Sequence, residues 1–254
     1  MKTWLIVFVA LVAAAAFLPA APEITLSAAA SLTNVLQDLR APAEAFCGAK
    51  VLLNLGASGT LRRQIEEGAP VDVFFSAARL DMDQLQKKGL VIPETRVDLL
   101  GNSLVLVGGP EARTVTGKDE LRAVLQSASV LAIGDPEAVP AGRYAKEALS
   151  TWGLWDLVAS KTARAGSVRE ALQFVQSGSA PVGIVFKTDA SSAAPAGPVK
   201  VLFSFPNEIL AAPIVYPVAV VAATANRAAA EKLVQFLRGD TARQAFLAAG
   251  FTLP

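Results

Sequence analysis

Short apolar runs alternate with amphipathic stretches of helical period along most of the chain. After residues 24–30, Leu32, Val35, Leu36 and Leu39 occupy the i, i+3, i+4 and i+7 positions of one helix face. This alternation predicts βα units and a mostly parallel sheet. The apolar runs predict strands at residues 24–30, 51–55, 71–76, 103–108, 130–133, 182–186, 199–205 and 216–221. Periodic stretches predict further helices at residues 59–67, 80–88, 143–152, 167–176, 227–238 and 241–249.

The βα pattern occurs in two sets, which are separated by the apolar run at residues 103–108 and closed by two terminal helices. We therefore expect an α/β fold of two lobes, each a mixed sheet flanked by helices, with a ligand cleft between them. Residues 22–103 and 206–254 are assigned to the first lobe, and residues 104–205 to the second. Ligands of open α/β sheets bind outside the carboxyl ends of the strands, so the strand-to-helix corners are the candidate site.

The first 21 residues have the character of a secretory signal peptide. Lys2 is followed by an uncharged run over residues 3–21, with an apolar core and an end rich in small residues. An uncleaved membrane anchor is the alternative, because residues 4–21 approach the length that spans a bilayer. We expect cleavage, which would leave a periplasmic mature protein with equal numbers of basic and acidic residues.

The composition excludes several classes of function. With 53% apolar residues, 18% charged residues and a mean hydropathy of +0.44, the chain is expected to fold. The 23 Lys and Arg nearly balance 22 Asp and Glu, so no basic surface for nucleic acid is expected. The absence of His excludes Ser-His and Cys-His catalytic pairs and His-ligated metals. The single cysteine, Cys47, excludes an internal disulfide and cysteine-rich zinc sites.

Four strand-to-helix corners carry residues suited to binding an anion. Ser31 and Ser58 are each placed as the N-cap of a helix, Ala141 lies near a helix start, and Ser167 precedes the helix that begins with Val168. Helix N-termini offer unpaired amides and about half a positive charge. Serines also cap helices throughout proteins without binding anything. The four corners therefore form an anion site only if the fold brings them together.

Five segments at these corners and nearby resemble the family of periplasmic molybdate-binding proteins (ModA-type) of ABC importers. They are residues 28–34, 60–70, 134–142, 180–185 and 216–220, and the resemblance extends from about Glu23 to the end of the chain. It implies a two-lobed periplasmic-binding-protein type II fold, a buried tetrahedral oxyanion, molybdate and also tungstate, and delivery to an ABC permease. It further implies a monomer that is not an enzyme and has neither a cofactor nor a protein-bound metal. Carried over by position, the ligand contacts are the hydroxyls and amides of Ser31 and Ser58 and the amides of Ala141 and Val168.

One position departs from the family pattern. The family has a tyrosine hydroxyl where this chain has Phe186. The loss of one hydrogen bond to a charged oxygen costs about 1.5–3 kcal/mol, or roughly ten- to a hundredfold in affinity. The hydroxyls of Thr188, Tyr216 or Tyr144, or a water molecule, are candidates to replace it. The departure leaves the preference between molybdate and tungstate open.

Other functions remain as alternatives. Three arginines would favour an organic acid if they lined the cleft, because carboxylates attract bidentate guanidinium groups: Arg62, Arg143 and Arg169. Sulfate or thiosulfate is a further possible ligand, and a sensor subunit would bind the same anion as a transport protein. A periplasmic enzyme on the same fold would draw its acid and base groups from carboxylates at three positions: Asp72, Asp135 and Glu137.

Overall fold

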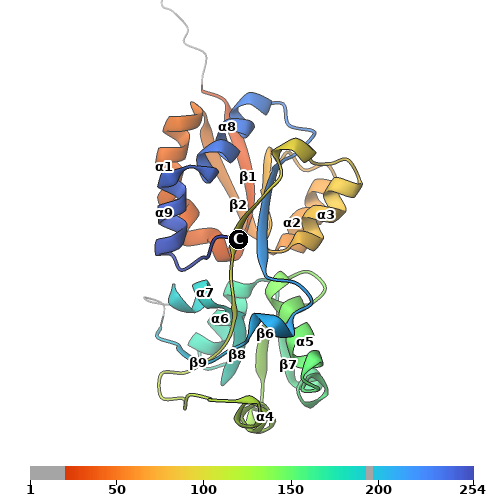
Figure 1. Ribbon diagram of the computed structural model, residues 1–254, viewed down its shortest axis with the longest axis vertical. Coiled ribbons are helices and arrows are strands. Elements are labelled where there is room, and N and C mark those ends of the chain that lie inside the picture. The colour runs from red at the N-terminus through yellow and green to blue at the C-terminus, as the bar shows by residue number, and fades with distance from the viewer. Residues whose placement is uncertain (1–20, 193–196) are drawn as a thin grey trace, which may run out of the picture.

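The computed structural model describes residues 21–192 and 197–254, which form two lobes stacked along the long axis of the molecule (Figure 1). The predicted signal peptide falls almost wholly on residues 1–20, outside the described part. Among the described residues, no helix combines the length and apolar character needed to cross a membrane.

The first lobe is built on a five-stranded mixed sheet with the order β2-β1-β3-β10-β4. Its central strand β3 pairs in parallel with β1 and antiparallel with β10. The strands are β1 (Glu23–Ala29), β2 (Lys50–Gly56), β3 (Val73–Phe75), β4 (Val97–Gly101) and β10 (Val215–Val220). The helices are η1 (Ala30–Leu32), α1 (Thr33–Cys47), α2 (Ser58–Glu66), α3 (Arg79–Lys87), η2 (Pro93–Thr95), α8 (Arg227–Arg238) and α9 (Asp240–Ala248).

The second lobe is built on another five-stranded mixed sheet, with the order β7-β6-β8-β5-β9. Strand β6 pairs in parallel with β7 and β8, whereas β5 pairs antiparallel with β8 and β9. The strands are β5 (Leu104–Gly108), β6 (Leu131–Gly134), β7 (Thr162–Ala165), β8 (Val182–Phe186) and β9 (Lys200–Ser204). The helices are α4 (Lys118–Ser127), α5 (Pro140–Thr151), η3 (Trp155–Leu157), η4 (Ala159–Lys161), α6 (Val168–Gln176) and α7 (Lys187–Ser191), and η5 (Asn207–Ile209) precedes β10.

This architecture confirms the expected two-lobed α/β fold, and each of the eight predicted strands overlaps an observed one. The prediction missed β4, β7, α4 and the short α7. Strands β4 and β7 lie at sheet edges, where burial is incomplete and the apolar pattern is weak. Helix α4 buries only Leu121 and Leu125 of its ten residues, so its sequence looks like a polar connection. The residue limits of the two lobes stay a prediction.

The sheet topology directs six strand ends toward the junction of the lobes. Because β1, β2 and β3 run parallel, their carboxyl ends lie at one edge of the first sheet. The same holds for β6, β7 and β8 in the second sheet. The chain segments that leave these ends lead into η1, α2, α3, α5, α6 and α7, so helix N-termini of both lobes approach one another.

Candidate functional site

A small cavity lies between the lobes, at the strand ends described above. All five residues predicted to form or border the ligand site line it: Ser31, Ser58, Ala141, Val168 and Phe186. The other lining residues are Ala29, Ala30, Gly56, Ala57, Ala77, Val139 and Pro140. None of these described residues has a charged side chain, so the polar lining consists of hydroxyls and backbone groups.

Ser31 and Ser58 occupy helix starts, but the prediction that they are N-caps is wrong. Ser31 lies inside η1, and Ser58 is the first residue of α2, with Ala57 as the N-cap. Neither helix has a capping hydrogen bond from a side chain. The hydroxyls are engaged elsewhere, and amides in the first turn have no acceptor within their own helix. Each serine therefore carries, besides its hydroxyl, a backbone amide without an acceptor in its own helix.

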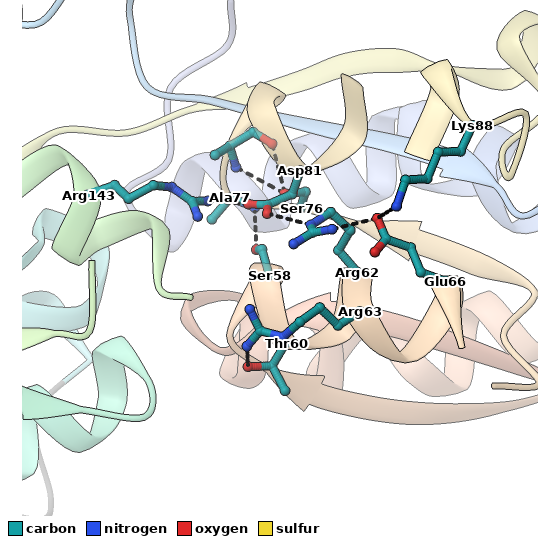
Figure 2. A network of polar contacts seen from close by, with 11 residues as sticks. Ser58, Thr60, Arg62, Arg63, Glu66, Ser76, Ala77, Asp81, Lys88 and Arg143 are labelled. Carbon is teal, nitrogen blue, oxygen red and sulfur yellow. Dashed lines mark hydrogen bonds and ion pairs between the residues drawn. The ribbon is translucent and has the colours of Figure 1, made fainter. Parts of the chain in front are cut away.

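The Ser58 hydroxyl is held from the side of the first lobe. The Ala77 amide, just beyond β3, donates a hydrogen bond to Ser58 Oγ at 2.9 Å (Figure 2). Ser58 is fully buried and Ala77 is 2% exposed, so solvent does not compete for this bond. Sequence reasoning missed Ala77, because an alanine that acts through its amide leaves no side-chain signal.

The second lobe contributes the amides at the starts of α5 and α6. Ala141 is the second residue of α5, and Val168 is the first residue of α6. The predicted cap at Ser167 is confirmed, since its Oγ accepts from the Glu170 amide at 3.1 Å. Glycine is required at Gly142, because a Cβ there would lie 1.8 Å from the carbonyl oxygen at the end of β6. This close approach fixes the start of α5 against the sheet.

Phe186 forms an apolar wall of the cavity. Its side chain is buried, and its ring centroid lies 5.7 Å from that of Tyr216 and 6.3 Å from that of Tyr144. Of the hydroxyls considered as replacements for the family tyrosine, that of Tyr216 lies 3.0 Å from Ser31 Oγ. Burial raises the pKa of Tyr144 to about 12 and the pKa of Tyr216 well above its usual value. Both phenols therefore keep their protons at neutral pH.

A chain of buried hydrogen bonds lies behind Ser31. Asn102, in the segment that joins β4 to β5, places its Nδ2 3.0 Å from the Tyr216 hydroxyl and 2.9 Å from Thr188 Oγ1. Its Oδ1 accepts from the Ser103 amide at 2.8 Å. The chain thus connects Ser31 in the first lobe to Thr188 in the second through the crossover between them.

The lobes are in contact on the Ser58 side of the cavity. The Gly59 amide in α2 donates to the Ala138 carbonyl of the second lobe at 2.9 Å. Arg143 reaches from α5 to an ion pair with Asp81 of the first lobe, and Arg62 approaches the same carboxylate at 3.3 Å (Figure 2). Burial raises the pKa of Asp81, against the opposing effect of the two guanidinium groups. Neither arginine lines the cavity, because both face a carboxylate, so the condition under which they would favour an organic acid is not fulfilled.

Arg169 forms a second ion pair close to the cavity. Its Nε lies 2.5 Å from Oδ1 of the fully buried Asp189, and its Nη2 lies 3.5 Å from the Ser31 carbonyl across the lobe junction. Burial raises the pKa of Asp189 to about 6, although Arg169 acts in the opposite direction. This third arginine also lies outside the cavity lining, although it borders a wider groove on the α9 side of Ser31, together with the acidic Asp38.

The carboxylates considered as catalytic groups lie outside the cavity lining. Asp72 accepts hydrogen bonds from the Thr25 amide at 2.7 Å and from the Thr224 hydroxyl. Asp135 accepts from the Glu137 amide at 3.3 Å within the loop after β6. Asp72 thus links β1 to the segment after β10, whereas the Asp135 bond lies within one loop. The described residues include no cluster of three or more acidic or cysteine side chains suited to a metal ion.

Comparison with known proteins places the chain among extracellular binding proteins. Residues 24–252 match the profile of the bacterial extracellular solute-binding protein family. The molybdate-binding protein ModA of Escherichia coli (strain K12) is 42% identical over 236 residues, covering 91% of this chain and 89% of that protein. ModA of Haemophilus influenzae is 38% identical, covering 92% and 91%.

A solved structure agrees with these sequence relatives. The periplasmic molybdate-binding protein of Azotobacter vinelandii has a TM-score of 0.79 and 26% identity, covering 91% of this chain and 100% of that one. The expected family resemblance is therefore confirmed. The chain belongs to the bacterial extracellular solute-binding protein family and is a homologue of the ModA molybdate-binding proteins.

Proposed function

We propose that this protein captures a tetrahedral oxyanion, molybdate and also tungstate, outside the cytoplasmic membrane and delivers it to the permease of an ABC importer. The observation that carries the proposal is the cavity between the lobes, which hydroxyls and helix-start amides line without a charged side chain. Two relatives of the chain, at 42% and 38% identity, are molybdate-binding proteins. The oxyanion is cargo and not a cofactor.

The donor set is suited to an anion that has lost its water. Dehydration of a dianion is costly, so several charge-assisted hydrogen bonds must replace the hydration shell together. Six donors are available at four residues, namely the hydroxyls and amides of Ser31 and Ser58 and the amides of Ala141 and Val168. The positive ends of α2, α5 and α6 add a favourable potential without a fixed counter-charge.

Closure of the two lobes completes this site. Two of the four residues come from each lobe, so a bound anion favours the arrangement in which the lobes touch. A permease that contacts both lobes would distinguish this closed form from an open one. In this proposal the signal peptide is cleaved and the mature protein acts as a periplasmic monomer.

Calorimetric titration of the purified mature protein with molybdate, tungstate, sulfate and hydrogen phosphate tests the proposal. We expect molybdate and tungstate to bind far more tightly than the other two, because the hydrogen phosphate proton would meet a wall rich in donors. The cavity must exclude sulfate by size, since its bonds to oxygen are shorter. Failure of both molybdate and tungstate to bind below millimolar concentration would refute the function.

Single substitutions test the assigned donors. Ser31→Ala and Ser58→Ala should each weaken molybdate binding by about ten- to a hundredfold, the cost of one hydrogen bond to a charged group. Ser27→Ala is the matched control, because Ser27 is a buried serine on β1 that accepts from Asn54 and lies outside the cavity. A loss of affinity in the control equal to that in the site variants would contradict the assignment.

An organic acid is the alternative ligand that the structure disfavours. Recognition of a carboxylate would call for an available guanidinium, and each of the three candidate arginines lies in an ion pair instead. Titration with a set of small dicarboxylates tests this alternative directly. Submicromolar binding of any of them would favour it over an inorganic oxyanion.

A further inference from the structure

Hydrogen bonds from outside the cavity determine which atom of each serine hydroxyl faces the ligand. A hydroxyl can either donate or accept, and distances alone leave the direction of the contact between Ser31 and Tyr216 undefined. The direction follows from the next partner in this series of hydrogen bonds, Asn102, which contacts the Tyr216 hydroxyl. A backbone amide can only donate, so the atom of Asn102 that faces the Ser103 amide must be its oxygen.

This orientation fixes the remaining bonds in order. The Asn102 amide nitrogen carries two hydrogens and has no acceptor capacity, so it donates to Thr188 Oγ1 and to the Tyr216 oxygen. Ser31 and Asn102 are the only hydrogen-bond partners of the Tyr216 hydroxyl in the described part of the chain. Tyr216, which accepts from Asn102, therefore donates its one hydrogen to Ser31 Oγ. The hydrogen of Ser31 is then left free.

The same logic holds for Ser58 with a shorter chain. The Ala77 amide donates to Ser58 Oγ at 2.9 Å, so this oxygen is an acceptor toward the protein and its hydrogen is free. Both serines line the cavity, and each receives a hydrogen bond from the side away from it. A hydroxyl that already accepts a hydrogen bond is polarised and becomes a stronger donor.

We propose that Tyr216 and Asn102 are positioning residues that hold the Ser31 hydroxyl as a hydrogen donor to the bound oxyanion. This inference rests on the proposed function, and it assigns to two residues outside the ligand contacts a role in selecting ligands without protons. Phe186 packs against the Tyr216 ring, so this hydrogen-bond chain lies directly beside the position where the family has its tyrosine.

Two substitutions change the donor and acceptor roles in the hydrogen bonds from Asn102 to Ser31 in different ways. Tyr216→Phe removes the donor to Ser31 Oγ and frees that hydroxyl to rotate among three staggered positions, which should weaken molybdate binding by about threefold or more. Asn102→Asp replaces the donor by an acceptor. Tyr216 would then donate to the new carboxylate, and Ser31 would donate to Tyr216 instead of to the ligand. We expect a loss of about ten- to a hundredfold.

A double-mutant cycle with Ser31→Ala separates this mechanism from a general disturbance. Molybdate affinity is measured by calorimetry for the wild type, for each single variant and for each variant combined with Ser31→Ala. If Tyr216 acts through Ser31, Tyr216→Phe should change the affinity by less than about twofold in the Ser31→Ala background. The added negative charge of Asn102→Asp weakens molybdate binding in both backgrounds. The effect of the reversed hydrogen bond is therefore the additional loss of affinity that is seen with Ser31 and not with Ser31→Ala.

The outcomes of this cycle are distinct. Equal losses in the two backgrounds, for both variants, would overturn the positioning role while leaving molybdate binding itself intact. Absence of molybdate binding by the wild type would instead refute the proposed function. If Tyr216→Phe fails to fold, the Asn102→Asp arm alone decides, because it keeps the size of the side chain.

Discussion

The ion pair between Arg143 and Asp81 makes a specific prediction about lobe closure. The Asp81 side chain is 2% exposed and faces Arg62 of its own lobe and Arg143 of the other (Figure 2). Separation of the lobes would break the pair with Arg143 and preserve the pair with Arg62. Arg143→Met should therefore destabilise the closed form selectively, while it retains most of the aliphatic length of the side chain.

The size of this effect follows from the environment of the pair. A hydrogen bond that involves charged groups contributes about 1.5–3 kcal/mol. The Arg143 side chain is 23% exposed, and Arg62 continues to compensate Asp81, so the lower end applies. A loss of about 1.5 kcal/mol in the closed form corresponds to roughly tenfold weaker molybdate binding, because binding is coupled to closure.

Calorimetry with molybdate measures the affinity, and small-angle X-ray scattering with and without the anion measures closure. Arg62→Met is the matched control, since its pair with Asp81 lies within one lobe and should be unaffected by lobe separation. It should lower the melting temperature of the unliganded protein more than it lowers affinity. The reasoning would be refuted if Arg143→Met bound molybdate within twofold of the wild type.

Three further predictions follow from contacts around the cavity. Gly59→Ala would place a Cβ 2.6 Å from the Ala138 carbonyl oxygen of the other lobe, so we expect at least tenfold weaker molybdate binding with little change in unliganded melting temperature; an unchanged affinity would contradict the contact. Phe186→Tyr should tighten oxyanion binding by about tenfold in calorimetry, and weaker binding would mean that the new hydroxyl does not face the ligand. Burial raises the pKa of Asp189 to about 6, so its contribution to stability is full below about pH 4 and is lost as the pH rises through 6. Chemical denaturation across this range should show Asp189→Asn gaining roughly 3 kcal/mol relative to the wild type, whereas parallel curves would contradict the shift.

The sequence predicts the fold well where an element is buried on a continuous face. Strands such as β1 and β8 are apolar along most of their length, and the apolar face of α6 repeats at helical spacing. Edge strands give no such signal, because their packing comes from one neighbour and not from a full apolar surface. Helix α5 was expected from residue 143 and begins at Pro140, because the apolar pattern by itself does not include the start signal that a proline gives at the first helical position.

The candidate site, too, was predictable from the sequence in one part and not in another. Sequence reasoning selected Ser31, Ser58, Ala141 and Val168 at four separate corners, and the structure brings all four to one cavity. Their role in binding an anion stays a prediction. The groups behind them could not be inferred from one sequence, because their partners are distant in the chain. Ser31 and Tyr216, for example, are separated by 185 positions.

The arginines show why distance along the chain limits such reasoning. Taken from the sequence, Arg62 and Arg143 were possible ligands for an organic acid, because carboxylates attract bidentate guanidinium groups. In the fold, Asp81 of α3 lies between them and engages both. Asp81 therefore explains why neither arginine is available to a ligand, and a single sequence does not reveal these contacts.

The arrangement separates two tasks that one set of charges would perform poorly. If Arg143 or Arg169 faced the cavity, its full charge would bind many anions, including protonated ones, and would oppose release. Instead the guanidinium groups pair with Asp81 and Asp189 at the lobe junction, where their net charge is cancelled. The proposed ligand meets only neutral dipoles, so its selection depends on the number and direction of donors. Closure of the lobes is favoured in turn by the Arg143–Asp81 pair, which lies outside the cavity lining, so each task can be altered by a separate substitution.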